Sequence, residues 1–416
     1  MKIELNQEKL KKHFRRSFNS LNHSRNNNYK FLFDKYNFKI DFEVDDNFNK
    51  NFTKIIEELH ENDVLKNNFP NKKLEKENLK IIKELHDYNK NSFNENKYYD
   101  LISNFEEKIN VILTKEYGEY CCIFHIDNLN LKNSLTVGDV IFHPIKDDKE
   151  CIKLNNKFKT KFFEKNKVYA FTKITGLDYY VYRKSYNEIK LALNIIKLFL
   201  NYQFCNFNID GSIFQNQNIP YILSSKKLRV QGVSVTGSIP HRIYADEKIN
   251  TLGLDILSRI MYKKSKTEFE KKLLTSIYWI GEAKTLQNTI YNKIAGENNT
   301  KDFLENLEFF ELYPIVVYLV IALETSFVFD SEHITTQVIE NVTNLISKKG
   351  YESFVKKFIS NIYNIRSKIV HTGTVYISQD DIKRLMDYTV KAMSYLIEGS
   401  THYHEMRYLN KIIQNE

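Results

Sequence analysis

The chain has 416 residues, and its 61 Lys and Arg side chains exceed its 52 Asp and Glu side chains, which gives a formal net charge of +9. Its 42% hydrophobic content can fill more than one core and indicates a globular protein of roughly two or three domains rather than a disordered chain. The basic excess favours a polyanionic partner without requiring one, because the Lys, Asn and Ile usage of an AT-rich genome produces the same balance.

Cysteine usage and targeting signals point to one compartment. The N-terminus lacks the apolar stretch of a signal peptide. The longest apolar run, 314–329, is shorter than the about 20 residues that cross a bilayer, and it contains Glu324. We expect a cytoplasmic protein with no membrane partner, no metal and no cofactor. Reduced core thiols are expected at Cys121, Cys122, Cys151 and Cys205, because these residues have no C-x-x-C spacing and no neighbouring His cluster.

The first 118 residues predict an arm followed by helices. Residues 1 to about 50 are Asn-rich and show no sustained apolar period, which is typical of an arm. From 51 to about 113, three stretches place apolar residues three and four apart, and this predicts two or three helices. The basic start forms either a phosphate-contacting stripe or a solvated helix face with no partner, and it consists of Lys9, Lys11, Lys12, Arg15 and Arg16.

The residue types and their spacing change at about residue 119 and again at about residue 246. Short β-branched and aromatic stretches over 119–245, separated by Gly, Asn, Asp and Pro, predict a mixed β-sheet with one long helix at 185–202 packed on it. Residues 246–416 predict an all-α bundle, so the expected fold class is α+β. Helices are expected at about 248–262, 267–294, 301–329, 332–348, 351–370 and 378–398, with a short one near 403–413. Ser378 and Asp381 provide an S-x-x-D capping signal.

The fifth of these helices ends in an unusual stretch, "YNIRSKIVHTG", which carries Arg366 and His371. Five positions turn through about 140° in a regular α-helix, so the two side chains do not stack on each other unless the helix loosens near Val370. The following Thr and Gly residues favour such loosening. The apolar face of the helix is expected to contain Phe354, Phe358, Ile362, Ile365 and Ile369.

Arg366 and His371 together suit metal-independent cleavage of RNA. An imidazole can accept the proton of the 2′-hydroxyl or protonate the leaving oxygen, because its ordinary pKa of about 6.5 lies near neutral pH. A guanidinium can bind the phosphate and stabilise the extra negative charge of the transition state. The structural alternative is that both cations only complement the dipole at the end of their helix.

Three stretches together resemble the Apea-like branch of the HEPN superfamily, small helical bundles that include many RNases of toxin, anti-phage and CRISPR-associated systems. "IYNIRSKIVHTG" is similar to Y-x-x-R-S-x-I-V-H-x-G of that branch, "LLTSIYWIGEA" (273–283) to its W-x-G-x-A helix, and "VIALETSF" (320–327) to its A-L-E-x-L-F stretch. The likeness covers about residues 246–400. It implies a HEPN-like bundle with Arg366 and His371 as the catalytic pair.

The resemblance also implies partners and supporting residues. HEPN RNases usually place the Arg-His motifs of two chains in one groove, which implies a homodimer or an internal pairing, and only one such motif is found here. Many HEPN proteins have Asn, Asp or His directly after the Arg. Here that position is Ser367, and a serine at this position is similar to the Apea-like branch. Glu324 is expected to orient Arg366, or else to lie on the exposed edge of its helix. A cytotoxic RNase needs restraint, so residues 119–245 are interpreted as a sensor or regulatory domain for a phage-derived, nucleotide or nucleic-acid trigger.

Other candidate residues have plainer interpretations. Trp279 is expected in the core rather than as a platform for RNA bases. His402 and His404 are expected at the surface, because no Cys or acidic cluster adjoins them to complete a metal site.

The sequence therefore predicts a dimeric, cytoplasmic endoribonuclease of the HEPN type, acting in anti-phage defence or as a toxin, that leaves cyclic-phosphate and 5′-hydroxyl ends. The alternative is a catalytically silent HEPN-fold module that dimerises and senses a ligand or partner. A third interpretation is the restrained half of a toxin–antitoxin pair.

Overall fold

The computed structural model describes residues 3–23, 46–89, 92–201, 205, 207–216, 219–224, 246, 251–296, 312–329, 331–347, 350–373 and 375–399. The chain divides into two compact units. Unit 1 comprises Met1–Tyr120, Ile174–Lys184 and Asn216–Pro220, and unit 2 comprises Cys121–Lys173, Ser185–Gln215 and Tyr221–Glu416. The expected helix 403–413, His402 and His404 lie outside the described residues.

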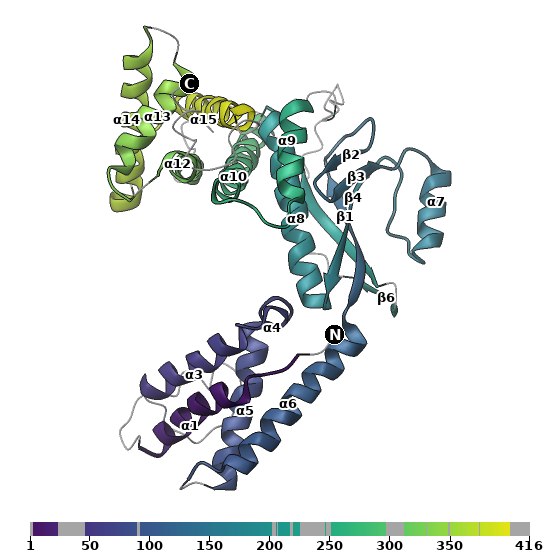
Figure 1. The fold of residues 1–416 in the computed structure, drawn as a ribbon. Helices are drawn as coiled ribbons and strands as arrows, with labels where there is room; N and C mark the ends of the chain where they lie inside the picture. The colour runs from purple at the N-terminus through teal and green to yellow at the C-terminus, as the bar shows by residue number, and fades with distance from the viewer. Residues whose placement is uncertain are drawn as a thin grey trace. The chain divides into compact units, whose positions relative to one another are not determined.

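Unit 1 is helical. Its elements are α1 (Gln7–His23), α3 (Asp46–Leu59), α4 (Asp63–Asn68), α5 (Asn71–Tyr88) and α6 (Glu95–Glu116) (Figure 1). The expected arm is wrong for residues 7–23, which form α1. Leu10, Phe14 and Phe18 recur at a spacing of four, so they line one face of that helix and are buried in the unit 1 core. Burial of these apolar side chains therefore stabilises α1, although the Asn-rich sequence that follows made the helical periodicity hard to recognise.

The basic residues of α1 are largely paired within unit 1. Lys9 Nζ lies 2.6 Å from a Glu58 carboxylate oxygen, and Lys11 Nζ lies 3.5 Å from one of Glu95. Arg15 also pairs with Glu95. These carboxylates from α3 and α6 offset the positive charge of the stripe, which favours a solvated, internally paired face over a phosphate-binding one.

Two histidines of unit 1 make its stability depend on pH. Burial lowers the pKa of His13, although Glu58 opposes the shift, and burial and Lys66 lower the pKa of His60. A lowered pKa means that the unfolded chain takes up the proton first as the pH falls below the ordinary value of 6.5. The stability contributed by the neutral imidazoles is therefore present above that value and is lost below it.

We accordingly expect unit 1 to melt at a lower temperature at about pH 5.5 than at about pH 7.5. A variant with His13→Gln and His60→Gln should lose less between the two conditions, as measured by thermal unfolding followed by circular dichroism. Equal losses in the parent and the double variant would show that other groups govern the acid response.

Most of the sheet belongs to unit 2, and its strand order is β2-β3-β4-β1-β5-β6. The strands are β1 (Gly118–Asp127), β2 (Leu135–Val137), β3 (Val140–Pro144), β4 (Val168–Gly176), β5 (Asn208–Asn216) and β6 (Ile219–Ser224). The described registers, β2 with β3 and β3 with β4, are both antiparallel, so the expected mixed character is not found in them. For β2 and β3 the physical reason is their two-residue turn, where Gly138 at φ +60° allows a tight hairpin.

Helices cover both faces of this sheet. The expected long helix is α8 (Asp178–Phe199), and a second helix that the sequence analysis missed, α7 (Asp148–Lys157), packs on the opposite face (Figure 1). Along β1, Phe124 faces Tyr186 of α8 with ring centroids 6.5 Å apart, whereas Ile123 belongs to the cluster that contacts α7. Successive side chains of β1 thus point to opposite faces of the sheet, and one set packs against α8 while the other packs against α7.

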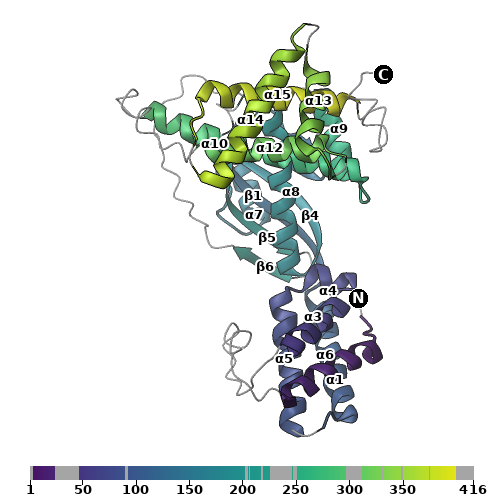
Figure 2. The same ribbon diagram turned by 90° about the vertical axis from the view of Figure 1, so that its left-hand side faces the viewer.

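The remainder of unit 2 is a helical bundle (Figure 2). It consists of α9 (Thr251–Tyr262), α10 (Glu268–Gly296), α12 (Tyr313–Phe327), α13 (Ile334–Ile346), α14 (Glu352–Thr372) and α15 (Gln379–Gly399), in agreement with the expected helices apart from residues 301–311, which lie outside the described residues. The capping prediction is confirmed, because Asp381 N–H donates to Ser378 Oγ at 3.1 Å. The α+β class is thereby confirmed. Within the described ranges, no helix is long and apolar enough to cross a membrane.

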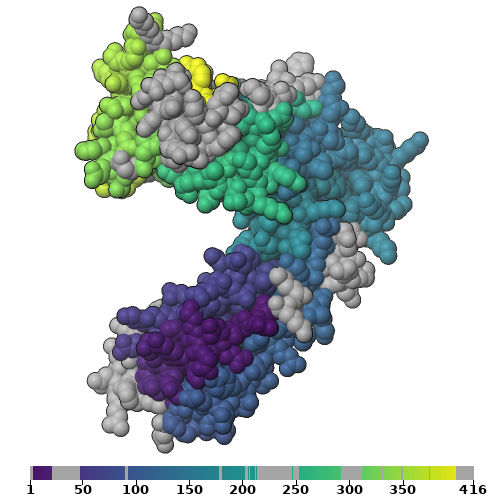
Figure 3. Space-filling model, viewed as in Figure 1, coloured from purple at the N-terminus to yellow at the C-terminus, as the bar shows by residue number. Residues whose placement is uncertain are grey.

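The bundle is joined to the sheet through α8 and α10. Lys284 on α10 is buried, and its ammonium donates to the carbonyls of Lys197, Leu198 and Leu200 at 3.0, 2.9 and 2.7 Å, where α8 ends. Burial lowers the pKa of Lys284 to about 8, so the group is still charged at neutral pH and complements the dipole of α8. Figure 3 shows the green residues of α10 directly against the teal residues of this part of unit 2.

Gly281 brings α8 and α10 close together. A Cβ atom at this position would lie 2.4 Å from Asn194 Cγ. Asn194 is fully buried, and its amide donates to the Tyr278 carbonyl at 3.3 Å and to Glu282 at 3.2 Å. Glycine is therefore required here by packing rather than by backbone conformation.

Gly281→Ala should lower the free energy of unfolding by about 1–3 kcal/mol, because the added methyl group overpacks the contact with Asn194. Urea unfolding measures the loss. Adding Asn194→Ala to the same chain should recover part of it by vacating the space. An unchanged unfolding free energy for Gly281→Ala would contradict the tight contact.

Candidate functional site: the end of α14

The end of α14 differs from the expectation in one respect. The helix does not loosen near Val370 but continues to Thr372, and Gly373 at φ +70° closes it by donating its N–H to the Ile369 carbonyl at 3.2 Å. The Thr372 hydroxyl also donates to the Lys368 carbonyl at 2.8 Å, within the helix. Glycine in the left-handed region thus ends the helix two residues later than expected.

This continuity separates Arg366 and His371. In a regular helix they differ by about 140° around the axis and by about 7.5 Å along it. Arg366 is half-buried, whereas His371 is exposed in the last turn. The two groups therefore present themselves to different surroundings within one chain.

The buried face of α14 is rotated from the expected one. Phe354 is 50% exposed and does not belong to it, which corrects the predicted stripe. Val355, Ile359 and Tyr363 are buried instead, together with Phe358, Ile362 and Ile365. Because the stripe drifts around the helix, Arg366, one turn after Tyr363, lies at its edge and is held partly inside the bundle.

Glu324 on α12 takes part in this edge, although not through the expected partner. It is half-buried, and no ion pair between Glu324 and Arg366 is found among the described residues. The group beside Glu324 is Tyr363. Burial and the Glu324 carboxylate raise the pKa of Tyr363, and Arg366 opposes this shift with a smaller effect. The Tyr363 hydroxyl and Arg366 Nε are buried and have no well-formed hydrogen bond, although the Glu324 carboxylate is close enough to the hydroxyl to raise its pKa.

Of the remaining predicted residues, Ser367 and Trp279 lie on helices of the bundle, and the four cysteines lie in and near the sheet. Ser367 is exposed on α14. Trp279 is half-buried and packs against Tyr318 of α12 with ring centroids 5.1 Å apart, so the expected packing role agrees with its position. The four cysteines form no disulfide. Cys122 and Cys205 are buried, whereas Cys121 and Cys151 are only partly buried, so the expected core position is wrong for these two.

A second polar arrangement that sequence reasoning missed lies at the start of β2. Ser134 Oγ is 2.8 Å from His143 Nδ1, and His143 Nε2 is 2.7 Å from a Glu150 carboxylate oxygen. The imidazole can pass a proton along this chain, but the neighbouring N–H groups of Lys132 and Asn133 already donate to the Asp246 carboxylate, at 2.9 and 3.0 Å. They provide no vacant donors for an oxyanion. These hydrogen-bonded side chains connect the β2–β3 hairpin to α7.

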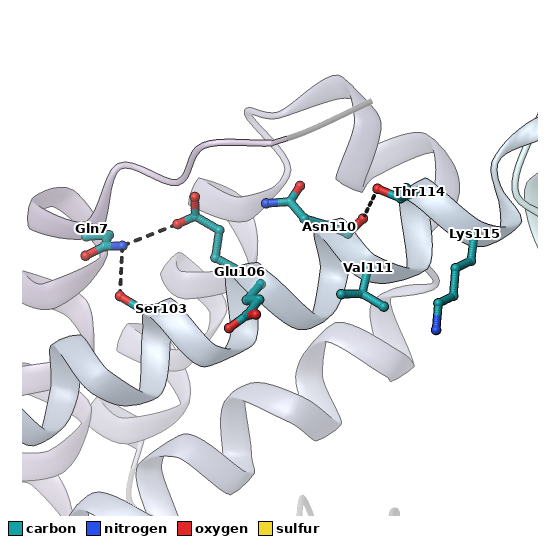
Figure 4. Close-up of a pocket in the computed structure, with 8 residues that line it drawn as sticks. Gln7, Ser103, Glu106, Asn110, Val111, Thr114 and Lys115 are labelled. Carbon is teal, nitrogen blue, oxygen red and sulfur yellow. Dashed lines mark hydrogen bonds between the residues drawn. The ribbon is translucent and has the colours of Figure 1, made fainter.

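Unit 1 carries an open hollow beside α6 (Figure 4). Gln7 Nε2 donates to Ser103 and Glu106 at 3.5 and 3.3 Å, and Thr114 Oγ1 donates to the Asn110 carbonyl at 2.7 Å. Several of the polar side chains that line the hollow, Gln7, Ser103, Glu106 and Thr114, are thus already hydrogen-bonded within unit 1. No group of three or more His, Cys, Asp or Glu side chains suited to a metal ion occurs in the part of the chain that the structure describes.

Comparison with known proteins identifies no relative: no family model, no curated protein and no solved structure matches the chain.

Proposed function

We propose that the bundle of unit 2 is a metal-independent endoribonuclease of the HEPN type, acting in the cytoplasm as an anti-phage or toxin effector. The observation that carries the proposal is the environment of its two cations: a half-buried Arg366 beside Tyr363 and Glu324, and an exposed His371 in the last turn of the same helix. Arginine held partly out of water binds phosphate more strongly than a freely solvated one. A solvent-facing imidazole can exchange protons with substrate and water.

In this mechanism each group has a separate task. The His371 imidazole removes the proton of the 2′-hydroxyl, whose oxygen attacks the adjacent phosphorus, or protonates the departing 5′-oxygen. The Arg366 guanidinium stabilises the negative charge that develops on the phosphorane-like transition state. The products are a 2′,3′-cyclic phosphate and a 5′-hydroxyl. Ser367, exposed beside Arg366, can position the RNA.

The continuous helix favours a site built by two chains. Since Arg366 and His371 point about 140° apart, one chain does not bring both to one scissile phosphate without distortion. A second copy, related by a twofold axis, can supply the missing group from its own α14. We therefore include a homodimer in the proposal, with residues 119–245 as the regulatory part that responds to a phage-derived, nucleotide or nucleic-acid trigger.

His371→Ala should abolish RNA cleavage while the fold is retained, because the substitution removes the proton-transferring group from an exposed position. Arg366→Ala should lower the rate of RNA cleavage by about a hundredfold or more, because it removes the charge that stabilises the transition state. The measurement is incubation of each purified protein with total RNA in EDTA, followed by mapping of the new ends. Lys357→Ala is the control, since it removes an exposed cation from the same helix.

Cleavage at the parental rate by the His371 variant would refute the assignment. A parent that binds RNA or a partner but never produces cyclic-phosphate ends would instead establish the silent binding module. Equal losses in the Lys357 and Arg366 variants would indicate a general charge effect rather than a specific site.

The two-chain site makes a complementation prediction. Co-expressed Arg366→Ala and His371→Ala chains, purified through two different tags, should give mixed dimers with one intact pair of groups and about half the parental activity. Homodimers of either variant, carrying the same tags, should be inactive.

Inactive mixed dimers would place Arg366 and His371 of the same chain at one phosphate. Failure to recover any doubly tagged protein would exclude the homodimer and with it the composite groove.

A further inference from the structure

Two of the buried polar atoms without a hydrogen-bond partner in the described part of the bundle lie close together on α14. The Tyr363 hydroxyl and Arg366 Nε are both buried and unpaired. They stand one helical turn apart on α14, and the Tyr363 hydroxyl lies beside the Glu324 carboxylate of α12. The large majority of buried polar groups in folded proteins are hydrogen-bonded, so two unpaired ones around one carboxylate require a physical explanation.

A phenylalanine would fill the same volume at position 363 without leaving a buried hydroxyl unsatisfied. A buried hydroxyl without a well-formed hydrogen bond lowers stability, so folding alone does not account for the tyrosine. Its position offers another use: Tyr363 is next to both Glu324 and Arg366, which are not themselves ion-paired. A hydroxyl can donate to the carboxylate and accept from the guanidinium N–H at the same time.

We propose that Tyr363 is a positioning residue of the ribonuclease site, whose hydroxyl links the Glu324 carboxylate to Arg366 Nε when RNA is bound. This inference rests on the proposed function. Hydrogen bonds at catalytic sites are often long or misaligned before substrate binds, and they tighten in the complex. With Nε held from inside the bundle, the two terminal nitrogens of Arg366 remain available for the two phosphate oxygens.

The geometry of α14 supports this order of contacts. Tyr363 lies on the buried face and Arg366 at its edge, so the chain from Glu324 through Tyr363 to Arg366 runs from the interior toward solvent. Glu324 and Arg366 form no ion pair with each other in the part of the chain that the structure describes. Tyr363 interacts with both Glu324 and Arg366, so its hydroxyl is placed to connect them.

Tyr363→Phe should lower the single-turnover rate of RNA cleavage by about ten- to a hundredfold through misplacement of Arg366. RNA affinity, measured by fluorescence anisotropy in a His371→Ala background so that the RNA is not cut, should stay within about twofold of the value with tyrosine, because the guanidinium charge remains. The melting temperature should be equal to or above that of the parent. Glu324→Gln combined with Tyr363→Phe should cost no more than the larger of the two single losses.

Tyr98→Phe provides the matched control. Tyr98 is also buried, but its hydroxyl donates to the Gln7 carbonyl at 2.9 Å in unit 1. This variant should lose stability and keep the parental cleavage rate at a temperature where it is folded.

The outcomes separate the two proposals. A parent that cleaves no RNA overturns both. Full activity in Tyr363→Phe, with His371→Ala inactive, overturns the positioning role alone. A reduced melting temperature in Tyr363→Phe, or losses that add with those of Glu324→Gln, would also overturn it, because the hydroxyl would then be structural or independent of Glu324.

Discussion

The contact on which the rest of unit 2 depends is the burial of the Lys284 ammonium at the end of α8. The last carbonyls of a helix have no partners within it, and here three of the carbonyls where α8 ends receive a charged donor from α10. Removing water from a cation is costly, so this arrangement is stable only while the carbonyls stay in place. The helix that covers the sheet and the central helix of the bundle are thereby fixed to each other.

From α10 the constraint continues to the proposed site. Ser276 Oγ lies 2.9 Å from the Ala322 carbonyl of α12, and the Ser326 hydroxyl donates to Ser276 at 2.7 Å, both in the buried interior. Glu324 lies between these two contacts on α12 and reaches the edge of α14 beside Tyr363. A shift of α8 relative to α10 would therefore move the groups that surround Arg366. This contiguous path gives a physical route by which a signal at the sheet could alter the site.

Periodicity predicted the bundle well because its helices are long and strongly amphipathic, and their bounds lie within a few residues of those expected, as for α14. It failed where the signal was short or diluted. α1 was missed beside Asn-rich sequence, although Leu10, Phe14 and Phe18 recur regularly, and α7 was missed although Asp147 and Glu150 provide a capping signal. At the site, the sequence indicated Arg366, His371 and Glu324, but it could not show that Tyr363 rather than Arg366 adjoins Glu324. That depends on the rotation of α14 against α12.

That rotation also determines what the Arg-His spacing means. Had the helix loosened, the spacing would have described a site complete within one chain. Gly373 ends α14 only after Thr372, so His371 keeps its helical direction and faces solvent while Arg366 faces the bundle edge. In the proposed ribonuclease the same pair would supply half of a site, because the exposed histidine could approach the arginine of a second chain. The glycine in the left-handed conformation that ends α14 is therefore the structural reason why the proposal includes a second copy of the chain.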